Sequence, residues 1–331
     1  MNKRERLEKT FAGEATDRVP AALWRQWPGD DQRAADLARS CVDYQNTYDW
    51  DFLKVTPNHN YCVTDYGVQD EWEGNLEGTR KTTRYFVSRS LDWTDLRPLD
   101  PLRGALGRHL ECLRLIPNGL KDADTPVLMT IFSPLSQAKF LAGDQRLLRH
   151  MRTNPDRVHT ALNVLTESTL RFFDELRRTP IAGIFYAMQH ASYDVMSVDE
   201  YQTFGWPYDR KILESIASTW WFNMAHFHGL SPMFQFAPQL PVQAINWHDR
   251  DTDPDLAHGR SQINVAACGG LSQWDHVHYG TPTTIKDAVR EAITVTNARR
   301  LIISTGCVTM VTSPQSNLRA VREAVEATGS S

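Results

Sequence analysis

The 331-residue sequence lacks an apolar run of the roughly 18 residues that a helix needs to span a bilayer, so we expect no membrane-embedded helix. It also lacks a long basic run, and its formal net charge of −4 argues against nucleic acid as a partner. The five cysteines are widely spaced, with no CxxC pair, which is typical of a reducing compartment. Because the first residues are charged and contain no apolar leader segment, we expect a cytoplasmic protein.

Linkers and nucleotide-binding patterns are missing as well. No stretch rich in Gly, Ser or Pro and no internal repeat interrupts the chain, so we expect one domain over residues 1–331. Neither GxGxxG nor GxxxxGK[ST] occurs, which removes the usual support for a nucleotide-binding open sheet.

Short apolar runs with the length and composition of buried strands recur along the chain. They are residues 18–24, 51–57, 126–134, 183–189, 220–229, 242–249, 262–270 and 300–307. Segments with helical periodicity lie between or after them, at residues 31–48, 147–176, 197–218, 283–297 and 314–328. Because parallel strands need crossover connections, this alternation predicts an α/β fold, a (β/α)8 TIM barrel. Residues 65–90 alternate polar and apolar side chains and predict an inserted antiparallel β-hairpin.

Histidine is frequent where the predicted strands end, and active sites of such barrels collect at those ends. His226 and His228 are two residues apart on one predicted strand, so both side chains point to the same side and can bind one metal. Cys307 ends the last predicted strand, and barrel closure could bring it to the same mouth. Two imidazoles and a thiolate leave the fourth position of a zinc ion open, as in catalytic zinc sites. In the alternative interpretation, the histidines hydrogen-bond in a metal-free polar mouth.

Other residues at the strand ends are candidates for catalysis or substrate binding. Arg25 has the planar donor geometry that captures a carboxylate or phosphate, and Trp24 beside it can stack on a planar ligand. The alternative for Arg25 is a surface ion pair. His190 is a candidate general base, with Gln189 beside it as a substrate contact, although a hydrogen-bonded loop histidine is the alternative. Trp247 either contacts substrate or packs the barrel mouth.

Three stretches resemble sequence patterns of the uroporphyrinogen decarboxylase (URO-D) superfamily. Residues 5–20 (ERLEKTFAGEATDRVP) are similar to its opening, and residues 197–213 are similar to its Ser-x-x-x-Phe/Tyr and Pro-Tyr helix. Residues 304–325 are similar to its closing Gly-Cys/His-Gly, Pro and Asn-Leu-x-Ala pattern. The resemblance covers nearly the whole chain and implies a (β/α)8 barrel with its site at the C-terminal mouth.

The resemblance implies one of two chemistries. True uroporphyrinogen decarboxylases need no metal and use an Arg-Gln-Ala-Gly-Arg motif and a closing His. Here Arg25-Gln26 matches the start of that motif, but Gly29 replaces its second Arg and Cys307 stands in place of the His.

The corrinoid-linked methyltransferases of the superfamily bind zinc through His-x-Cys and a late Cys. His226 and Cys307 match two of these ligands, and His228 replaces the middle Cys. Zinc accepts either imidazole or thiolate as a ligand. The resemblance therefore favours zinc as cofactor and methyl transfer from a corrinoid or similar donor to a thiol.

Several functions stay open on the sequence alone. The first is zinc-dependent methyl transfer with a methylcorrinoid as co-substrate. The second is metal-free decarboxylation of a carboxylated substrate such as uroporphyrinogen, and the third is a non-catalytic corrinoid-binding barrel. A metal-dependent hydrolase has less support, because the His-x-His of hydrolase barrels follows the first strand. The partners to consider are a small-molecule substrate, a corrinoid protein and a second copy of the chain in a homodimer.

Overall fold

A parallel sheet of seven strands forms the centre of the computed structural model, which describes residues 1–329. Its order is β1-β4-β5-β6-β7-β8-β9, and all neighbouring strands pair in parallel. The strands are β1 (Leu53–Val55), β4 (Val127–Phe132), β5 (Gly183–Met188), β6 (Met224–Phe227), β7 (Ala244–Asn246), β8 (Ala266–Leu271) and β9 (Leu301–Thr305). All their residues are buried, as in parallel sheets covered on both faces. The predicted α/β barrel-type fold is confirmed.

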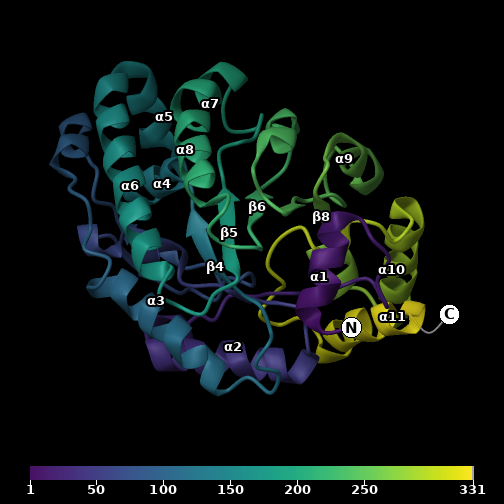
Figure 1. Cartoon of the computed structure of the whole chain (residues 1–331). Helices are drawn as coiled ribbons and strands as arrows, with labels where there is room; N and C mark the ends of the chain where they lie inside the picture. The colour runs from purple at the N-terminus through teal and green to yellow at the C-terminus, as the bar shows by residue number, and fades with distance from the viewer. Residues whose placement is uncertain (330–331) are drawn as a thin grey trace.

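Helices connect the strands and lie around the outside of the curled sheet (Figure 1). They are α1 (Lys3–Ala12), α2 (Ala34–Tyr48), α3 (Gly104–Leu115), α4 (Pro134–Ala142), α5 (Asp144–Thr153), α6 (Pro155–Leu176), α7 (Val198–Phe204), α8 (Trp206–Ile216), α9 (Leu256–Gln262), α10 (Pro282–Thr296) and α11 (Gln315–Gly329). The segments predicted at 147–176 and 197–218 are each divided into two helices. Pro155 starts α6, because proline has no N–H to continue α5. Among the described residues, no helix is both long and apolar enough to cross a membrane.

Within residues 1–329, the ring of strands closes without a regular eighth strand. Ala22 donates its backbone N–H to the carbonyl of Ile303 in β9 at 3.1 Å, and Ile303 donates to the carbonyl of Pro20 at 2.8 Å. Ala21 and Ile303 form a single parallel bridge. The predicted first strand, residues 18–24, is thus reduced to one bridge at the place in the ring where a strand was expected.

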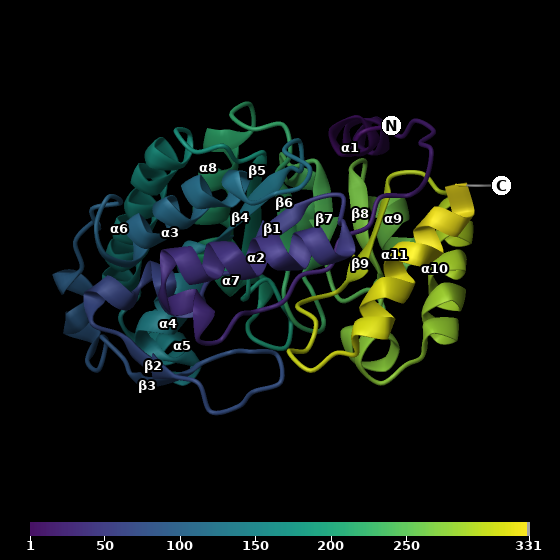
Figure 2. The same ribbon diagram turned by 90° about the horizontal axis from the view of Figure 1, so that it is seen from below.

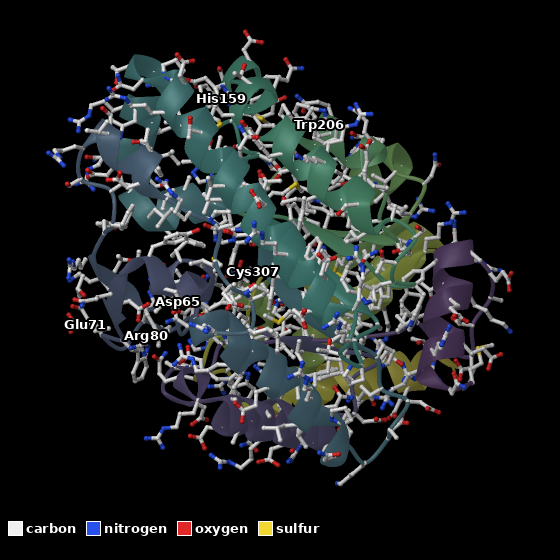
Figure 3. The ribbon with its side chains drawn as sticks, turned by 60° about the vertical axis from the view of Figure 1, so that its left-hand side comes forward. Asp65, Glu71, Arg80, His159, Trp206 and Cys307 are labelled. Carbon is white, nitrogen blue, oxygen red and sulfur yellow. The ribbon has the colours of Figure 1, made fainter. Side chains whose placement is uncertain are left out.

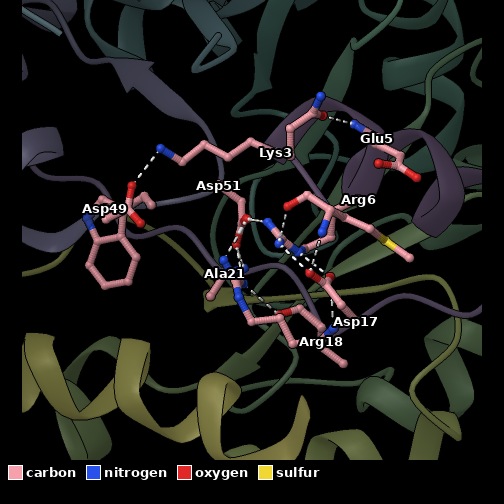
Figure 4. Close-up of polar contacts among 12 residues, drawn as sticks. Lys3, Glu5, Arg6, Asp17, Arg18, Ala21, Asp49 and Asp51 are labelled. Carbon is pink, nitrogen blue, oxygen red and sulfur yellow. Dashed lines mark hydrogen bonds and ion pairs between the residues drawn. The ribbon is translucent and has the colours of Figure 1, made fainter. Parts of the chain in front are cut away.

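The carboxylate of Asp51 replaces part of the missing ladder. Asp51 donates its backbone N–H to the carbonyl of Ala21 at 2.9 Å, and its fully buried carboxylate accepts the N–H of Ala21 at 2.7 Å. Pro20 has no N–H to contribute, so the segment cannot pair regularly. The same carboxylate accepts hydrogen bonds from Arg6 and Arg18, each at 2.7 Å (Figure 4). These charges join α1 and the extended segment to the start of β1.

A two-stranded antiparallel hairpin lies within the predicted range of residues 65–90. It consists of β2 (Gln69–Glu71) and β3 (Lys81–Arg84), and the loop between them extends beside the barrel (Figure 2). The loop is fixed to the C-terminal part of the chain, because Val311 donates its N–H to the carbonyl of Leu76 at 2.7 Å. Gly78 has a φ of 79°, and a Cβ there would lie 2.8 Å from Cβ of Gln26. A larger residue at this position would displace the loop.

The buried Asp51 cluster makes a first prediction. We expect Asp51→Ala to lower the free energy of unfolding by about 3–5 kcal/mol, because it leaves two buried guanidinium groups without their shared carboxylate. Urea denaturation measures the change. Asp43→Ala, at an exposed position of α2, is the control and should change stability by less than about 0.5 kcal/mol. Equal effects of the two substitutions would contradict the role given to Asp51.

Candidate metal centre

A cavity of about 280 Å³ opens where the strands of the barrel end. Residues at or just past the C-terminal ends of several strands line it, namely Thr56, Phe132, Ala187, His226 and Cys307. The hairpin contributes a further part of the wall through Glu77, Thr79, Thr82 and Tyr85. In Figure 3, Cys307 lies in the interior of the molecule, while Glu71 and Arg80 mark the hairpin at its edge. The hairpin thus forms part of the site.

Four potential metal ligands meet in this part of the barrel: His226, His228, His248 and Cys307. One donor atom from each lies within 4.8 Å of all the others. Nε2 of His226 is 3.4 Å from Nδ1 of His228, which in turn is 3.7 Å from Sγ of Cys307. The structure therefore brings together the three predicted ligands and adds His248 as a fourth donor.

The separations between donor atoms fit a tetrahedral zinc ion. With ordinary bond lengths, such an ion places two nitrogen ligands about 3.3 Å apart and a nitrogen and a sulfur about 3.6 Å apart. The distances of 3.4 Å and 3.7 Å in the cluster are close to these values. A direct hydrogen bond between two imidazoles would be shorter, about 2.9 Å. The mixed nitrogen and sulfur donor set also suits zinc.

His248 is oriented by a carboxylate on its other side. Its Nδ1 lies 3.6 Å from Oδ2 of Asp251, whose Oδ1 accepts a hydrogen bond from Ser272. Nε2 of His248 is buried and has no hydrogen-bond partner within residues 1–329, so this nitrogen is available to a metal. Carboxylate–histidine pairs of this kind commonly hold a metal-binding imidazole in place.

The cluster also sets the protonation of its members. Burial alone would raise the pKa of Cys307, but the neighbouring imidazoles of His226, His228 and His248 lower it well below the usual thiol value. Burial alone would lower the pKa of His248, but Asp251 and Cys307 raise it to about 9. This shift favours the thiolate, the form of cysteine that binds metals. A cation entering the cluster would displace the proton from His248, because a metal ligand must be deprotonated.

The structure places the other predicted residues at different distances from the cavity. Trp24 and Gln189 line it. Arg25 is not among the lining residues, although Trp24 and Gln26 on either side of it are. The guanidinium of Arg25 packs over the ring of Trp27 at 4.7 Å, and its Nε donates to the carbonyl of Gln26. The structure does not bring Arg25 into the cavity.

His190 and Trp247 also lie outside the cavity lining. His190 is buried, and its Nε2 lies 3.8 Å from Oδ1 of Asp144. Burial lowers the pKa of His190 to about 3, so its imidazole is neutral. Trp247 is fully buried and donates its indole N–H to the carbonyl of Pro254 at 2.7 Å. This buried position agrees with the alternative in which Trp247 packs the barrel mouth and does not contact substrate.

Four charged residues of the cavity were not among the predicted site residues: Lys54, Glu77, Lys139 and Asp144. Glu77 reaches it from the hairpin loop and accepts a hydrogen bond from Gln273 at 3.4 Å. Burial raises the pKa of Glu77, and the negative charge of Cys307 raises it further. Lys54 points into the cavity from β1. Neither Glu77 nor Lys54 belongs to a recognisable motif, although Lys54 interrupts an otherwise apolar strand.

The comparisons with known proteins point to one family. The family model described as uroporphyrinogen decarboxylase (URO-D) matches residues 78–328. A methylated-thiol–coenzyme M methyltransferase of Methanosarcina mazei is 24% identical over 62% of this chain, which spans only 54% of that relative. The methylcobamide:CoM methyltransferase MtbA of the same organism is 20% identical over 97% of this chain and 96% of its own length.

Solved structures give the same fold. A methyltransferase from Methanosarcina mazei superposes with a TM-score of 0.87 at 18% identity, over 99% of both chains. A B12-independent methionine synthase from Shewanella superposes with a TM-score of 0.57 at 13% identity, over 95% of this chain and 93% of its own.

Metal analysis tests the site directly. We expect the wild-type protein, reconstituted with zinc and dialysed, to hold one ion per chain by elemental analysis. His248→Ala and Cys307→Ser should each weaken zinc binding by more than about 100-fold, because each removes a donor. Their far-UV circular dichroism should match the wild type, since the core does not depend on the site.

His258→Ala is the matched control. His258 is 78% exposed, beside Asp255 at the start of α9, and its removal should leave the zinc content unchanged. Full zinc occupancy in Cys307→Ser would show that the cluster is not the metal site.

Proposed function

The chain belongs to the uroporphyrinogen decarboxylase (URO-D) family, and from this premise we propose that it is a zinc-dependent methyltransferase. It would pass a methyl group from a methylated corrinoid or similar donor to a small thiol. The observation that carries the proposal is the meeting of His226, His228, His248 and Cys307 beside the cavity. Relatives named for methyl transfer involving methylcobamide and coenzyme M support it.

The four donors define what the site can supply. His226, His228, His248 and Cys307 would hold the zinc ion, which lowers the pKa of a substrate thiol and presents it as a thiolate at neutral pH. The site predicted from the sequence had three protein ligands and an open position. His248 adds a fourth donor to that set, so a substrate thiol would reach the ion only as an added or an exchanged ligand.

Glu77 would accept the thiol proton. It lines the same cavity as Cys307, and its carboxylate is partly buried. The raised pKa of Glu77 makes it a stronger base than an exposed glutamate. In the complete step the thiol proton passes to Glu77 and the sulfur bonds to the methyl carbon. The electron pair of the broken methyl–donor bond stays with the donor.

The size of the cavity limits what can enter it. A volume of about 280 Å³ suits a small molecule and lies just below the usual range for drug-sized ligands. A corrinoid macrocycle is larger than this space. The methyl donor must therefore approach the mouth from outside, which supports a corrinoid protein as the partner that presents it.

Methyl transfer can be measured with methylcobalamin and a thiol such as coenzyme M. We expect the zinc-loaded protein to demethylate methylcobalamin, followed by the change in its visible absorption, and to form the thioether. Cys307→Ser should reduce the rate by at least about 100-fold, because the metal and its thiolate ligand are lost together. Methyl transfer by metal-free protein would overturn the proposal, and decarboxylation of uroporphyrinogen by such protein would favour the metal-free alternative.

The role of Glu77 has its own test. Glu77→Gln should lower the rate of methyl transfer by about 100-fold while leaving the zinc content unchanged, because it removes the proton acceptor but no proposed ligand. Glu73→Gln is the matched control on the same hairpin, since Glu73 is exposed and pairs with Lys81. Similar rates for Glu77→Gln and wild type would show that the proton leaves by another route.

A further inference from the structure

Lys54 is a buried lysine on the wall of the cavity. It lies in β1, is 6% exposed and lines the same space as His226 and Cys307. Its ammonium donates a hydrogen bond to Oγ1 of Thr56 at 3.1 Å. Within residues 1–329, it forms no ion pair with a carboxylate. Buried lysines usually have a charged partner, so this one has unused binding capacity.

Aromatic rings flank the ammonium group. Nζ of Lys54 lies 4.3 Å from the ring centroid of Phe185 and 5.5 Å from that of Trp24. Cation–π contacts of this kind compensate only part of the loss of hydration. Burial accordingly lowers the pKa of Lys54 to about 7. A Met or Leu would fill this position in an apolar strand at lower free energy.

One aromatic ring links Lys54 to the candidate metal centre. The ring of Phe185 faces the ammonium and also packs against the imidazole of His226, with 5.2 Å between the two ring centroids. A small molecule in the cavity can therefore contact Lys54 at one end and the His/Cys cluster at the other. Lys139, which also lines the cavity, already pairs with Asp144 at 3.4 Å.

We propose that Lys54 is a specificity-determining residue that binds an anionic group of the substrate, a carboxylate or a sulfonate, inside the cavity. The inference rests on the proposed function for the identity of the other end of the substrate, the thiol. Cys307 and Cys41 are the acidic groups whose charge favours the ammonium form of Lys54, and no carboxylate of the described residues pairs with it. An anion on the substrate would supply this direct partner.

Calorimetric binding to the zinc-loaded protein tests the assignment. The probes are 2-mercaptoethanesulfonate, 3-mercaptopropionate and the neutral 2-mercaptoethanol. Wild-type protein should bind the two anionic thiols at least about tenfold more tightly than the neutral one, as expected for a charge-assisted hydrogen bond. Lys54→Met should lose this preference and bind 2-mercaptoethanol as the wild type does.

Two further measurements separate binding from structure. Lys139→Met should keep the preference for anionic thiols, because Lys139 is already paired; loss of the preference in this variant too would overturn the assignment. Without ligand, Lys54→Met should unfold at the same temperature as the wild type or higher, because it removes an unpaired buried charge. A clearly lower unfolding temperature would make Lys54 a structural residue instead.

A probe without a thiol distinguishes this inference from the proposed function. Ethanesulfonate has the anionic group but no thiol, so its Lys54-dependent binding would stand even if no methyl transfer were found. Conversely, methyl transfer with equal affinity for anionic and neutral thiols would leave the proposed function intact and would falsify the role of Lys54.

Discussion

The buried carboxylate of Asp51 is the contact on which the ring of strands depends. It occupies the place where a regular eighth strand would have offered backbone groups, and it accepts hydrogen bonds from two arginines, of which Arg6 is also paired with Asp17. β9 pairs with β8 on one side and meets Pro20 and Ala22 on the other, and Cys307 follows its end. Sγ of Cys307 and Nδ1 of His228 belong to residues 79 positions apart in the sequence. The curled sheet brings these two atoms to within 3.7 Å of each other. The barrel thus carries the His/Cys cluster at one end and the ion pairs of Asp51 at the other.

Much of the fold and the centre of the site could be predicted from local patterns. Buried strands leave continuous apolar runs, so seven of the eight expected runs are strands of the sheet. Side-chain alternation was enough to place His226 and His228 on one side. The first expected strand became a single bridge because Pro20 lacks an N–H and Asp51 captures the N–H of Ala21.

The residues that were missed or misplaced depend on contacts that no local pattern reveals. His248 lies two residues beyond the end of β7, in a turn where alternation no longer fixes the direction of a side chain. Glu77 is at the tip of a hairpin, and the sequence does not tell where such a tip meets the barrel. Arg25 follows Trp24 in an extended segment, and only the structure shows that Trp24 is the one that faces the cavity.

The hairpin of β2 and β3 shares no hydrogen-bonded ladder with the seven-stranded sheet in the described part of the chain. It nevertheless supplies one wall of the cavity, through side chains such as Thr79 and Thr82. The groups that close the barrel and those that shape this wall therefore lie in separate parts of the chain. Substitutions in the hairpin can change which molecules fit without disturbing the closure at Asp51. This division makes the scaffold evolvable, because selection can alter its preference for ligands in small steps while folding is preserved.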